Sequence, residues 1–593
     1  MKTTVNPKEL VLLGGGHSHV EVLRAWGQHR LAGATSPAPG AAQAAPSHAP
    51  PMPATAPSPP PPPPPSASAA RVTLISRGRW TPYSGMLPGW AAGFYSFEEV
   101  HIDLQRLAAY AGARLVLGEA TGLDLEGRRV LLAPPPAQAP PQPTGQPAQA
   151  GADGGAGGGA APNQLGAQAQ AQAPGASGRW GGAVSWSVLS INTGITPGVR
   201  GVPGAQEHAT PVKPIDGFVR RFEGLLQRYR DAAAKTSPQP SAGRHEGDQH
   251  QGQGQGQGRP VVRVVVVGGG AGGVELAAAV RYRLEEERLR GGWPKECAAA
   301  KVSLVCRGGL LPGHPPHVRR LVARLLQARL GVEVRQRAEV TRASPGRLHL
   351  RLLGGSGGGG GGGGTGGGGG GKEVQEVQEV QEVLTADEVL WCTQAAPPEW
   401  VAASGLPTDG RGFLALNDCL QAEGGPPEVF GAGDVATVTR HPRPKAGVFA
   451  VRQGPPLARN LAAHLAGRPL EPFTPQSTAL ALITLGGRFC VASRTGGVAA
   501  KRPAGAGAGA GSRPAAGSGR PEDEDDGPEW PLGWLLNGCG GLAVDLTGPL
   551  LWRWKDGIDR AFMRRYGEGL PPGDWERGGG AGGGFETGKR HTE

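Results

Sequence analysis

The sequence predicts an α/β fold that contains two units of the strand–glycine turn–helix type. The first unit consists of the apolar run Leu10–Leu13, a glycine turn, and apolar residues at helical spacing. The second repeats this order: Val261–Val267 contains six valines, Gly268–Gly270 follow, and helical spacing starts at Val274. A continuous β-branched run without polar alternation indicates a strand buried on both faces of a parallel sheet. Two such openings therefore predict two parallel sheets covered by helices.

Glycine and proline, with 103 and 58 residues, make up more than a quarter of the 593-residue chain and are concentrated in five tracts. These tracts bury too little apolar surface to offset the entropy of ordering them, so we interpret them as insertions between elements. The fourth, with the Val-Gln-Glu repeat that follows it, is predicted to be an expanded hairpin tip. The five tracts are 31–70, 133–179, 235–258, 354–372 and 499–527.

Periodicity and turn residues place the other elements. The predicted strands are 71–76, 187–191, 301–305, 332–334 and 428–430, and the predicted helices are 103–111, 215–232 and 316–330. A further amphipathic helix is expected at 549–566. Two interpretations of that helix remain open: it lies in a membrane interface, or it docks on the protein's own core or on a partner subunit.

Cysteine spacing and charge exclude several classes of site. The six cysteines form no CxxC or CxxxxC pair, which argues against a zinc site, a disulfide framework and a redox-active dithiol. His17, His19 and His101 fit no common ligand spacing, so no metal is expected. The net charge of +11 is dispersed and accompanies no nucleic-acid motif, so no nucleic-acid partner is expected.

The sequence also bears on location. No uncharged apolar stretch reaches the roughly 18 residues that span a bilayer, and no recognisable targeting peptide precedes the first strand. The scattered cysteines indicate a reducing compartment. We therefore expect a cytoplasmic protein, or one that is peripheral on an organelle membrane.

Both glycine turns match the dinucleotide-binding fingerprint GxGxxG. Gly14 and Gly16 supply its first two glycines, and His19 stands where the third would be. Gly268, Gly270 and Gly273 supply all three in the second unit. The first glycine permits a sharp turn and the second lets the backbone approach a pyrophosphate, whose charge is favoured at a helix N-terminus.

The acidic residue that usually binds a ribose hydroxyl after the second strand is missing from both units. Ser76 and Arg77 occupy the first position, and Cys306 and Arg307 the second. Two interpretations of Arg307 remain open: it binds the 2′-phosphate of NADPH, or it is a solvated surface residue.

A third motif lies near the C-terminal side, at Val429–Asp434. A strand that ends in small residues and one aspartate presents a carboxylate at the carboxyl edge of a sheet, where open α/β folds bind ligands. After two glycine fingerprints, Gly433 and Asp434 are therefore candidate binding residues.

With these residues in place, the sequence resembles the type II NAD(P)H dehydrogenases and the pyridine nucleotide-disulfide oxidoreductases. It is similar in particular to the NADH dehydrogenase-like flavoprotein module that is fused to selenide, water dikinase in some organisms; the dikinase part is absent. The segments that carry this resemblance are 13–24 (LGGGHSHVEVLR), 71–89 (RVTLISRGRWTPYSGMLPG), 445–457 (KAGVFAVRQGPPL) and 552–563 (WRWKDGIDRAFM).

The resemblance implies two cofactors, FAD and NAD(P)H, and assigns residues to each. Thr193-Gly194 and Thr393-Gln394 resemble the turns that join the two domains. The residues assigned to FAD are Gly14, Gly16, His17, His19, Thr193, Gly194, Gly433, Asp434 and Gln453, and those assigned to the nicotinamide nucleotide are Gly268, Gly270, Gly273 and Glu275.

The resemblance also implies the organisation of the chain. Two Rossmann-type domains bind FAD and NAD(P), and a C-terminal extension follows. The expected divisions are 1–214 and 395–470 for the two parts of the FAD-binding domain, 215–394 for the NAD(P)-binding domain, and 471–593 for the C-terminal region.

The implied activity is hydride transfer from reduced nicotinamide to flavin, followed by electron release to a quinone or similar small acceptor. In this scheme the Arg452-Gln453 segment lies near the flavin ring, and the loop around Tyr83 covers it. No catalytic side chain is assigned. The alternative is a flavin-binding redox partner or sensor linked to selenium metabolism with little turnover. Peripheral membrane contact through 549–566 and a homodimer are further expectations.

Overall fold

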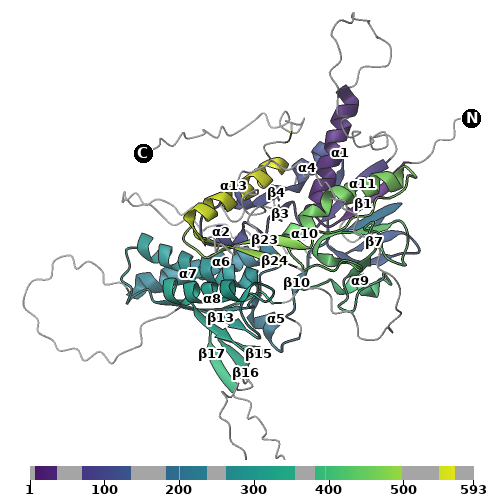
Figure 1. Cartoon of the computed structure of the whole chain (residues 1–593). Coiled ribbons are helices and arrows are strands. Elements are labelled where there is room, and N and C mark those ends of the chain that lie inside the picture. Colours follow the sequence, from purple (N-terminus) through teal and green to yellow (C-terminus); the bar gives the residue numbers. More distant parts are fainter. Residues whose placement is uncertain are drawn as a thin grey trace, which may run out of the picture.

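A computed structural model describes residues 7–35, 70–134, 182–199, 201–236, 262–353, 381–393, 395–496, 547–567 and 570. In this part of the chain two five-stranded parallel sheets stand beside several small antiparallel sheets. Figure 1 shows the first sheet with its helices at the upper right and the second at the lower left. The predicted α/β class with two parallel sheets is confirmed.

The first sheet contains the N-terminal glycine unit. Its strand order is β21-β9-β1-β2-β5, and every neighbouring pair is parallel. The edge strand β21 follows all five strands of the second sheet in the sequence, so the chain returns to the first sheet after it has supplied the second. The strands are β1 (Lys8–Leu13), β2 (Ala70–Ser76), β5 (Arg114–Leu117), β9 (Val188–Ile191) and β21 (Val429–Gly431).

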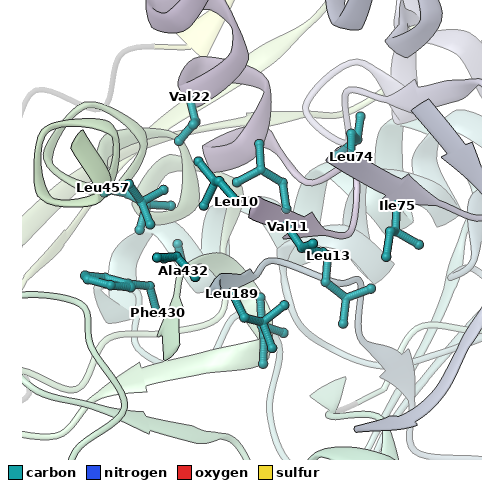
Figure 2. Packing of buried hydrophobic residues seen from close by; sticks show 14 of the residues in the cluster. Leu10, Val11, Leu13, Val22, Leu74, Ile75, Leu189, Phe430, Ala432 and Leu457 are labelled. Carbon is teal, nitrogen blue, oxygen red and sulfur yellow. The ribbon is translucent and has the colours of Figure 1, made fainter. Parts of the chain in front are cut away.

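Three helices cover one face of this sheet: α1 (His17–Thr35), α4 (Leu104–Ala111) and α11 (Gly454–Leu465). Figure 2 shows the core between them, where Leu10 and Val22 pack with Leu457. The predicted helix at 103–111 begins at Leu104, because the Asp103 carboxylate caps it by accepting from the backbone N–H groups of Gln105 and Arg106.

The second sheet contains the valine-rich strand. Its order is β11-β18-β12-β13-β14, again all parallel. The strands are β11 (Thr210–Pro211), β12 (Val262–Val267), β13 (Ala300–Cys306), β14 (Glu333–Gln336) and β18 (Glu388–Trp391). The helices are α6 (Ile215–Thr236), α7 (Ala271–Arg290) and α8 (Pro316–Arg324), which continues as the π-helical turn η1 (Leu325–Arg329).

The two faces of the second sheet have different covers. Val264 and Val266 pack in the core that contains α6, α7 and α8. Val265 and Val267 alternate to the other face and pack against a three-stranded antiparallel sheet and α5 (Ala205–His208). The expectation that helices cover both faces is therefore wrong for this face. The antiparallel strands are β15 (Ala338–Ser344), β16 (Arg347–Leu352) and β17 (Gln381–Thr385).

The predicted insertions fall between neighbouring elements. β16 and β17 pair as an antiparallel hairpin across the glycine tract, as predicted for an expanded hairpin tip. β6 (Ala120–Asp124), β7 (Arg129–Leu132) and β8 (Ala183–Ser185) form a second antiparallel sheet around the tract 133–179. The helix α1 extends to Thr35, so the prediction that the first tract starts at residue 31 is wrong; Leu31 and its alanine neighbours are good helix formers. The remainder of each tract lies outside the described residues.

Short elements connect the larger ones. β10 (Thr196–Pro197) and β19 (Ala395–Ala396) pair antiparallel, so the segments that leave β9 and β18 run side by side. The other short elements are β3 (Trp80–Pro82), α2 (Leu87–Ala91), α3 (Phe97–Val100), β4 (His101–Asp103), α9 (Glu399–Ala403), β20 (Leu414–Leu416), η2 (Gly433–Val435), β22 (Ala436–Val438) and α10 (Gly447–Arg452).

The C-terminal part consists of the hairpin β23 (Thr478–Thr484) and β24 (Cys490–Gly496), the strand β25 (Thr547–Gly548), and the helix α13 (Pro549–Tyr566). The predicted helix at 549–566 is thus present, and it packs on this sheet and on α3 and β4 (Figure 1, yellow). This is the docked alternative of the two interpretations. Its buried face carries Trp552, Asp559 and Tyr566, whereas Trp554 and Ile558 are half-buried. No helix among the described residues is long and apolar enough to span a membrane.

Candidate dinucleotide-binding site

The first glycine turn is closely packed against Asn192. Gly14 has a positive φ of 100°, and a β-carbon there would lie 2.4 Å from the backbone oxygen of Asn192. A β-carbon at Gly16 would lie 2.3 Å from Oδ1 of the same residue. Only glycine therefore fits at the two predicted positions, and the turn exposes backbone at the N-terminus of α1.

His19 occupies the position of the third glycine in the first fingerprint, and its side chain is buried and hydrogen-bonded. Its Nδ1 lies 2.7 Å from the Gly14 oxygen, and its Nε2 lies 2.8 Å from Oγ of Ser190 in β9. Burial lowers the pKa of His19 to about 4, against the hydrogen bond to Gly14, so the ring is neutral at pH 7. The side chain fixes the turn to the sheet and is structural.

The turn at Asp434 lies beside this first fingerprint. Gly433 has a φ of 73°, and its N–H donates to Oε1 of Gln453 at 2.6 Å. A β-carbon at Gly433 would lie 2.4 Å from Oδ1 of Asn192. The side chain of Asn192 therefore lies between the first glycine turn and the turn at Gly433. In the amide orientation that satisfies both of its ends, it accepts from the Ser18 N–H and donates to the Ala432 oxygen.

Two lysines lie near Asp434. Lys213 Nζ is 3.1 Å from Oδ2 of Asp434 and joins the segment after β11 to the first sheet. Lys445 is more deeply buried, donates to Oγ1 of Thr437 at 2.8 Å, and lines a cavity with Asp434, Phe449 and Gln453. Burial lowers the pKa of Lys445 to about 8, against the attraction of Asp409 and Asp434.

Two polar atoms near the first fingerprint have no partner. His17 Nε2 and Thr193 Oγ1 are buried and make no hydrogen bond among the described residues. Burial lowers the pKa of His17 to about 4, while Asp434 raises it and Lys213 lowers it. Buried polar groups are normally satisfied, so unsatisfied ones at a glycine turn fit a polar ligand. The residues present therefore fit a dinucleotide such as FAD.

The second fingerprint has the packing that its three glycines predict. Gly268 has a φ of 133° and lies against the backbone of Cys392, while a β-carbon at Gly273 would lie 1.9 Å from the Gly268 oxygen. Gly270 differs, because a β-carbon there would meet no atom within 4 Å. Two glycines thus serve close packing, and Gly270 leaves open space at the N-terminus of α7, which fits a second dinucleotide.

Glu275 points away from this turn toward the C-terminal sheet. Its Oε1 accepts from the backbone N–H and the hydroxyl of Thr484 in β23, at 2.9 and 3.0 Å. Burial raises the pKa of Glu275, and the charge of Lys555 opposes this. Lys555 pairs with Asp559 and donates to the Gly85 oxygen at 2.9 Å. α7, the loop before α2 and α13 therefore meet at one buried charged cluster.

The rings of Tyr83, Phe562 and His17 pack together between this charged cluster and the first fingerprint. Tyr83 stacks on Phe562 of α13 with ring centroids 4.5 Å apart, and His17 lies 5.4 Å from Tyr83 and 5.8 Å from Phe562. Burial and the charge of Asp559 raise the pKa of Tyr83, which keeps its hydroxyl protonated. The C-terminal helix thus forms one wall beside His17.

The structure brings together most of the predicted residues at two places. Gly14, Gly16 and Gly433 lie against Asn192, Gln453 accepts from Gly433, and His17 lies near Asp434; Gly268, Gly270 and Gly273 lie at the second sheet. Gly194 follows β9 with open space beside it. Gln394 and Cys539 lie outside the described residues.

Sequence reasoning missed Asn192, Lys445 and the pair Lys555–Asp559. Position was the available signal for Asn192, because it directly follows the buried strand β9. Lys445 lies in a segment singled out by resemblance alone.

Neither a metal site nor a disulfide is found in the described part of the chain. No group of three or more His, Cys, Asp and Glu residues there is arranged to hold a metal ion. The five cysteines that the structure describes are all unpaired.

The fold is a mixed α/β architecture that solved structures of other proteins share. The sulfide:quinone oxidoreductase from the hyperthermophilic bacterium Aquifex aeolicus shares it with a TM-score of 0.55 and 14% identity, over 96% of this chain and 94% of that one. NDH2 from Plasmodium falciparum shares it with a TM-score of 0.54 and 11% identity, over 95% of this chain and 99% of that one. Identities this low show the fold alone.

Residues 185–454 match the family described as pyridine nucleotide-disulphide oxidoreductase. No curated protein matches the chain in sequence. This match covers less than half of the 593-residue chain, so it is a similarity of that segment.

Proposed function

We propose that this protein is an FAD-dependent NAD(P)H dehydrogenase that passes electrons to a quinone or a similar small acceptor. The observation that carries the proposal is the presence of two glycine fingerprints on two parallel sheets, one of them beside unsatisfied buried polar atoms. One fingerprint is assigned to each dinucleotide, as in the family that the sequence resembles. The FAD/NAD-binding architecture supports this assignment.

The chain's own residues have distinct roles in this proposal. Gly14 and Gly16 open the backbone to the FAD pyrophosphate, whose charge the N-terminus of α1 favours. His17, Thr193 and Gly194 border it, and His19 holds the turn. Asp434 pairs with Lys213, and Gln453 accepts from the neighbouring Gly433 N–H; as the resemblance implies, Asp434 would meet the pyrophosphate and ribityl region of FAD.

The second fingerprint takes the nicotinamide nucleotide. Gly270 leaves room for its pyrophosphate, while Gly268 and Gly273 keep strand and helix in contact. Glu275 anchors this unit to the C-terminal sheet through Thr484. Bound flavin supplies the acceptance of hydride and the release of electrons, and the protein supplies placement and charge.

The electron acceptor in this proposal is a quinone or a similar small molecule. A dithiol acceptor has no support, because the six cysteines form no CxxC or CxxxxC pair. A quinone is supported by the sequence resemblance and by the fold shared with the sulfide:quinone oxidoreductase. Membrane contact through α13 is limited to its exposed face, which carries Leu550, Arg553, Arg564 and Arg565. The alternative of a selenium-linked sensor rests on resemblance alone.

Anaerobic stopped-flow absorbance tests the proposal. FAD-loaded protein is mixed with NADH or NADPH while the oxidised flavin band near ~450 nm is followed, a wavelength set by the cofactor's own chemistry. We expect bleaching by at least one nucleotide and recovery of the band on addition of a soluble quinone. A protein that retains FAD but is reduced by neither nucleotide contradicts the dehydrogenase proposal and favours the sensor alternative.

A further inference from the structure

The end of β13 lacks the carboxylate that would select NADH. Its last residue is Cys306, whose side chain lies against the second glycine turn: a β-carbon at Gly269 would be 2.7 Å from the Cys306 sulfur. Burial raises the pKa of this thiol to about 12, so it is uncharged at neutral pH. NAD-binding units place an acidic side chain at this strand end to accept from the ribose 2′-hydroxyl. That acceptor is missing here.

Two arginines leave the sheet together at this edge. β13 and β14 are parallel, and Cys306 stands opposite Gln336 in their register. The next residues, Arg307 and Arg337, therefore follow at the same carboxyl edge, beside β12, which ends at Val267 just before Gly268. The Arg337 N–H donates to the Gly308 oxygen at 3.2 Å, which holds the two turns against each other.

Neither guanidinium is fully neutralised. Arg307 is 69% exposed and lies 3.7 Å from Oε1 of Glu339, a long ion pair. The other oxygen of Glu339 already accepts from Arg351 at 2.6 Å. Arg337 is exposed and makes no side-chain hydrogen bond or ion pair among the described residues. This edge therefore has an excess of positive charge with free donors.

We propose that the nucleotide bound at the second fingerprint is NADPH, and that Arg307 and Arg337 bind its 2′-phosphate. This inference rests on the proposed function and specifies its substrate. Guanidinium groups suit phosphate oxygens because they are always charged and offer several donors in one plane. The end of β13 favours NADPH over NADH in two ways: its surroundings attract the 2′-phosphate of NADPH, and it offers no carboxylate to the 2′-hydroxyl of NADH.

The test measures affinity and not turnover. Isothermal titration calorimetry of the FAD-loaded protein with NADP⁺ and with NAD⁺ gives the two dissociation constants. 2′,5′-ADP serves as a third ligand, because it carries the phosphate without the nicotinamide. The variants are Arg307→Ala and Arg337→Ala. Arg320→Ala is the matched control, since Arg320 is an exposed arginine of α8 in the same domain.

We expect NADP⁺ to bind the wild-type protein at least tenfold more tightly than NAD⁺. Because each variant loses a charge-assisted hydrogen bond, we expect it to weaken the binding of NADP⁺ and 2′,5′-ADP about tenfold to a hundredfold. The affinity for NAD⁺ should change less than about twofold. Arg320→Ala leaves all three affinities unchanged. Higher salt should weaken the binding of NADP⁺ more than the binding of NAD⁺.

Several results would overturn the inference. Equal affinities of the wild-type protein for NADP⁺ and NAD⁺, with flavin that is still bleached by a reduced nucleotide, contradict the NADPH inference and leave the proposed function intact. The NADPH inference is also contradicted, and the proposed function left intact, if Arg307→Ala and Arg337→Ala weaken the binding of NADP⁺ and NAD⁺ to the same extent. A wild-type protein that binds neither nucleotide overturns the inference and the proposed function together.

Discussion

His17 is a partly buried histidine whose surroundings keep it uncharged. It stands first in α1, between Tyr83 and Phe562, and its Nε2 has no partner among the described residues. Burial lowers its pKa from 6.5 to about 4, and the nearby Asp434 only partly reverses this. The ring is therefore available as a neutral hydrogen-bonding group for a ligand at the glycine turn.

The folded protein should lose stability on mild acidification through His17. Between pH 6.5 and pH 4 the unfolded chain binds a proton at this histidine and the folded chain does not, so the free energy of unfolding falls as the pH falls, by about 1 kcal/mol per unit. Urea unfolding at several pH values, compared between wild type and His17→Gln, measures this contribution. We expect the variant to have the shallower pH dependence.

His208→Gln is the control for this prediction, because His208 is exposed on α5. It should leave the pH dependence unchanged. Identical slopes for wild type and His17→Gln would mean that the folded protein does not keep His17 neutral in this range.

Single residues also mark the limit of sequence-based prediction for the site. The glycines of both fingerprints were identifiable, because their spacing follows from the geometry of a phosphate-binding turn. Asn192 was not, although its side chain separates Gly16 from Gly433. Its position directly after β9 was a signal, but its role arises only because β9 and β21 become neighbours in the sheet.

At the scale of elements, α13 is unusual because its buried face is partly charged. Lys555 and Asp559 have side chains only 11% and 5% exposed and pair with each other four residues apart. Burial lowers the pKa of Lys555, but Asp559 and Glu275 outweigh this and raise it. In sequence, such a pair resembles an ordinary surface i,i+4 pair. The periodicity therefore predicted the extent of the helix, but it could not show that this charged pair is buried.

Removing one partner of this pair should destabilise the protein strongly. Lys555→Met leaves Asp559 buried without its cation, at a cost of about 3 kcal/mol in the free energy of unfolding. The double variant Lys555→Met/Asp559→Leu removes both charges and should regain part of that loss. Urea unfolding of wild type, both variants and the exposed-residue control Arg553→Ala measures the difference. A loss below about 1 kcal/mol for Lys555→Met would indicate that the pair is hydrated.

The covering of the second sheet shows why element-level prediction was incomplete. The valine run of β12 identified a strand buried on both faces. It carried no information on what packs against each face. α7 follows β12 directly and was therefore predictable, whereas β15–β17 come later in the chain and are interrupted by the glycine tract.

At the scale of the whole molecule, the two dinucleotide units are joined by paired connections and by the C-terminal helix. β10 and β19 run side by side where the chain leaves and re-enters the first domain. α13 then contacts β4 and α3 as well as β23 and β24. The sequence predicted the two sheets because the central strand of each, β1 or β12, is followed by a local glycine motif. It did not predict these long-range contacts, which depend on residues hundreds of positions apart.

In the proposed function, the first fingerprint holds flavin and the second holds the nicotinamide nucleotide that reduces it. Gly270→Val tests this division most directly. A β-carbon at Gly270 meets no protein atom, and its φ of −74° suits any residue, so the fold should accept the change while the added side chain occupies the nucleotide's space. Gly217→Val, at another glycine with open space, is the matched control.

The measurement is the rate at which the flavin band bleaches on anaerobic mixing with reduced nucleotide. We predict that Gly270→Val retains FAD with an unchanged absorbance spectrum but is reduced at least tenfold more slowly at limiting nucleotide, whereas Gly217→Val behaves like the wild type. Wild-type bleaching rates in Gly270→Val would contradict the assignment of the second fingerprint. Loss of FAD from that variant would contradict the assignment of the first.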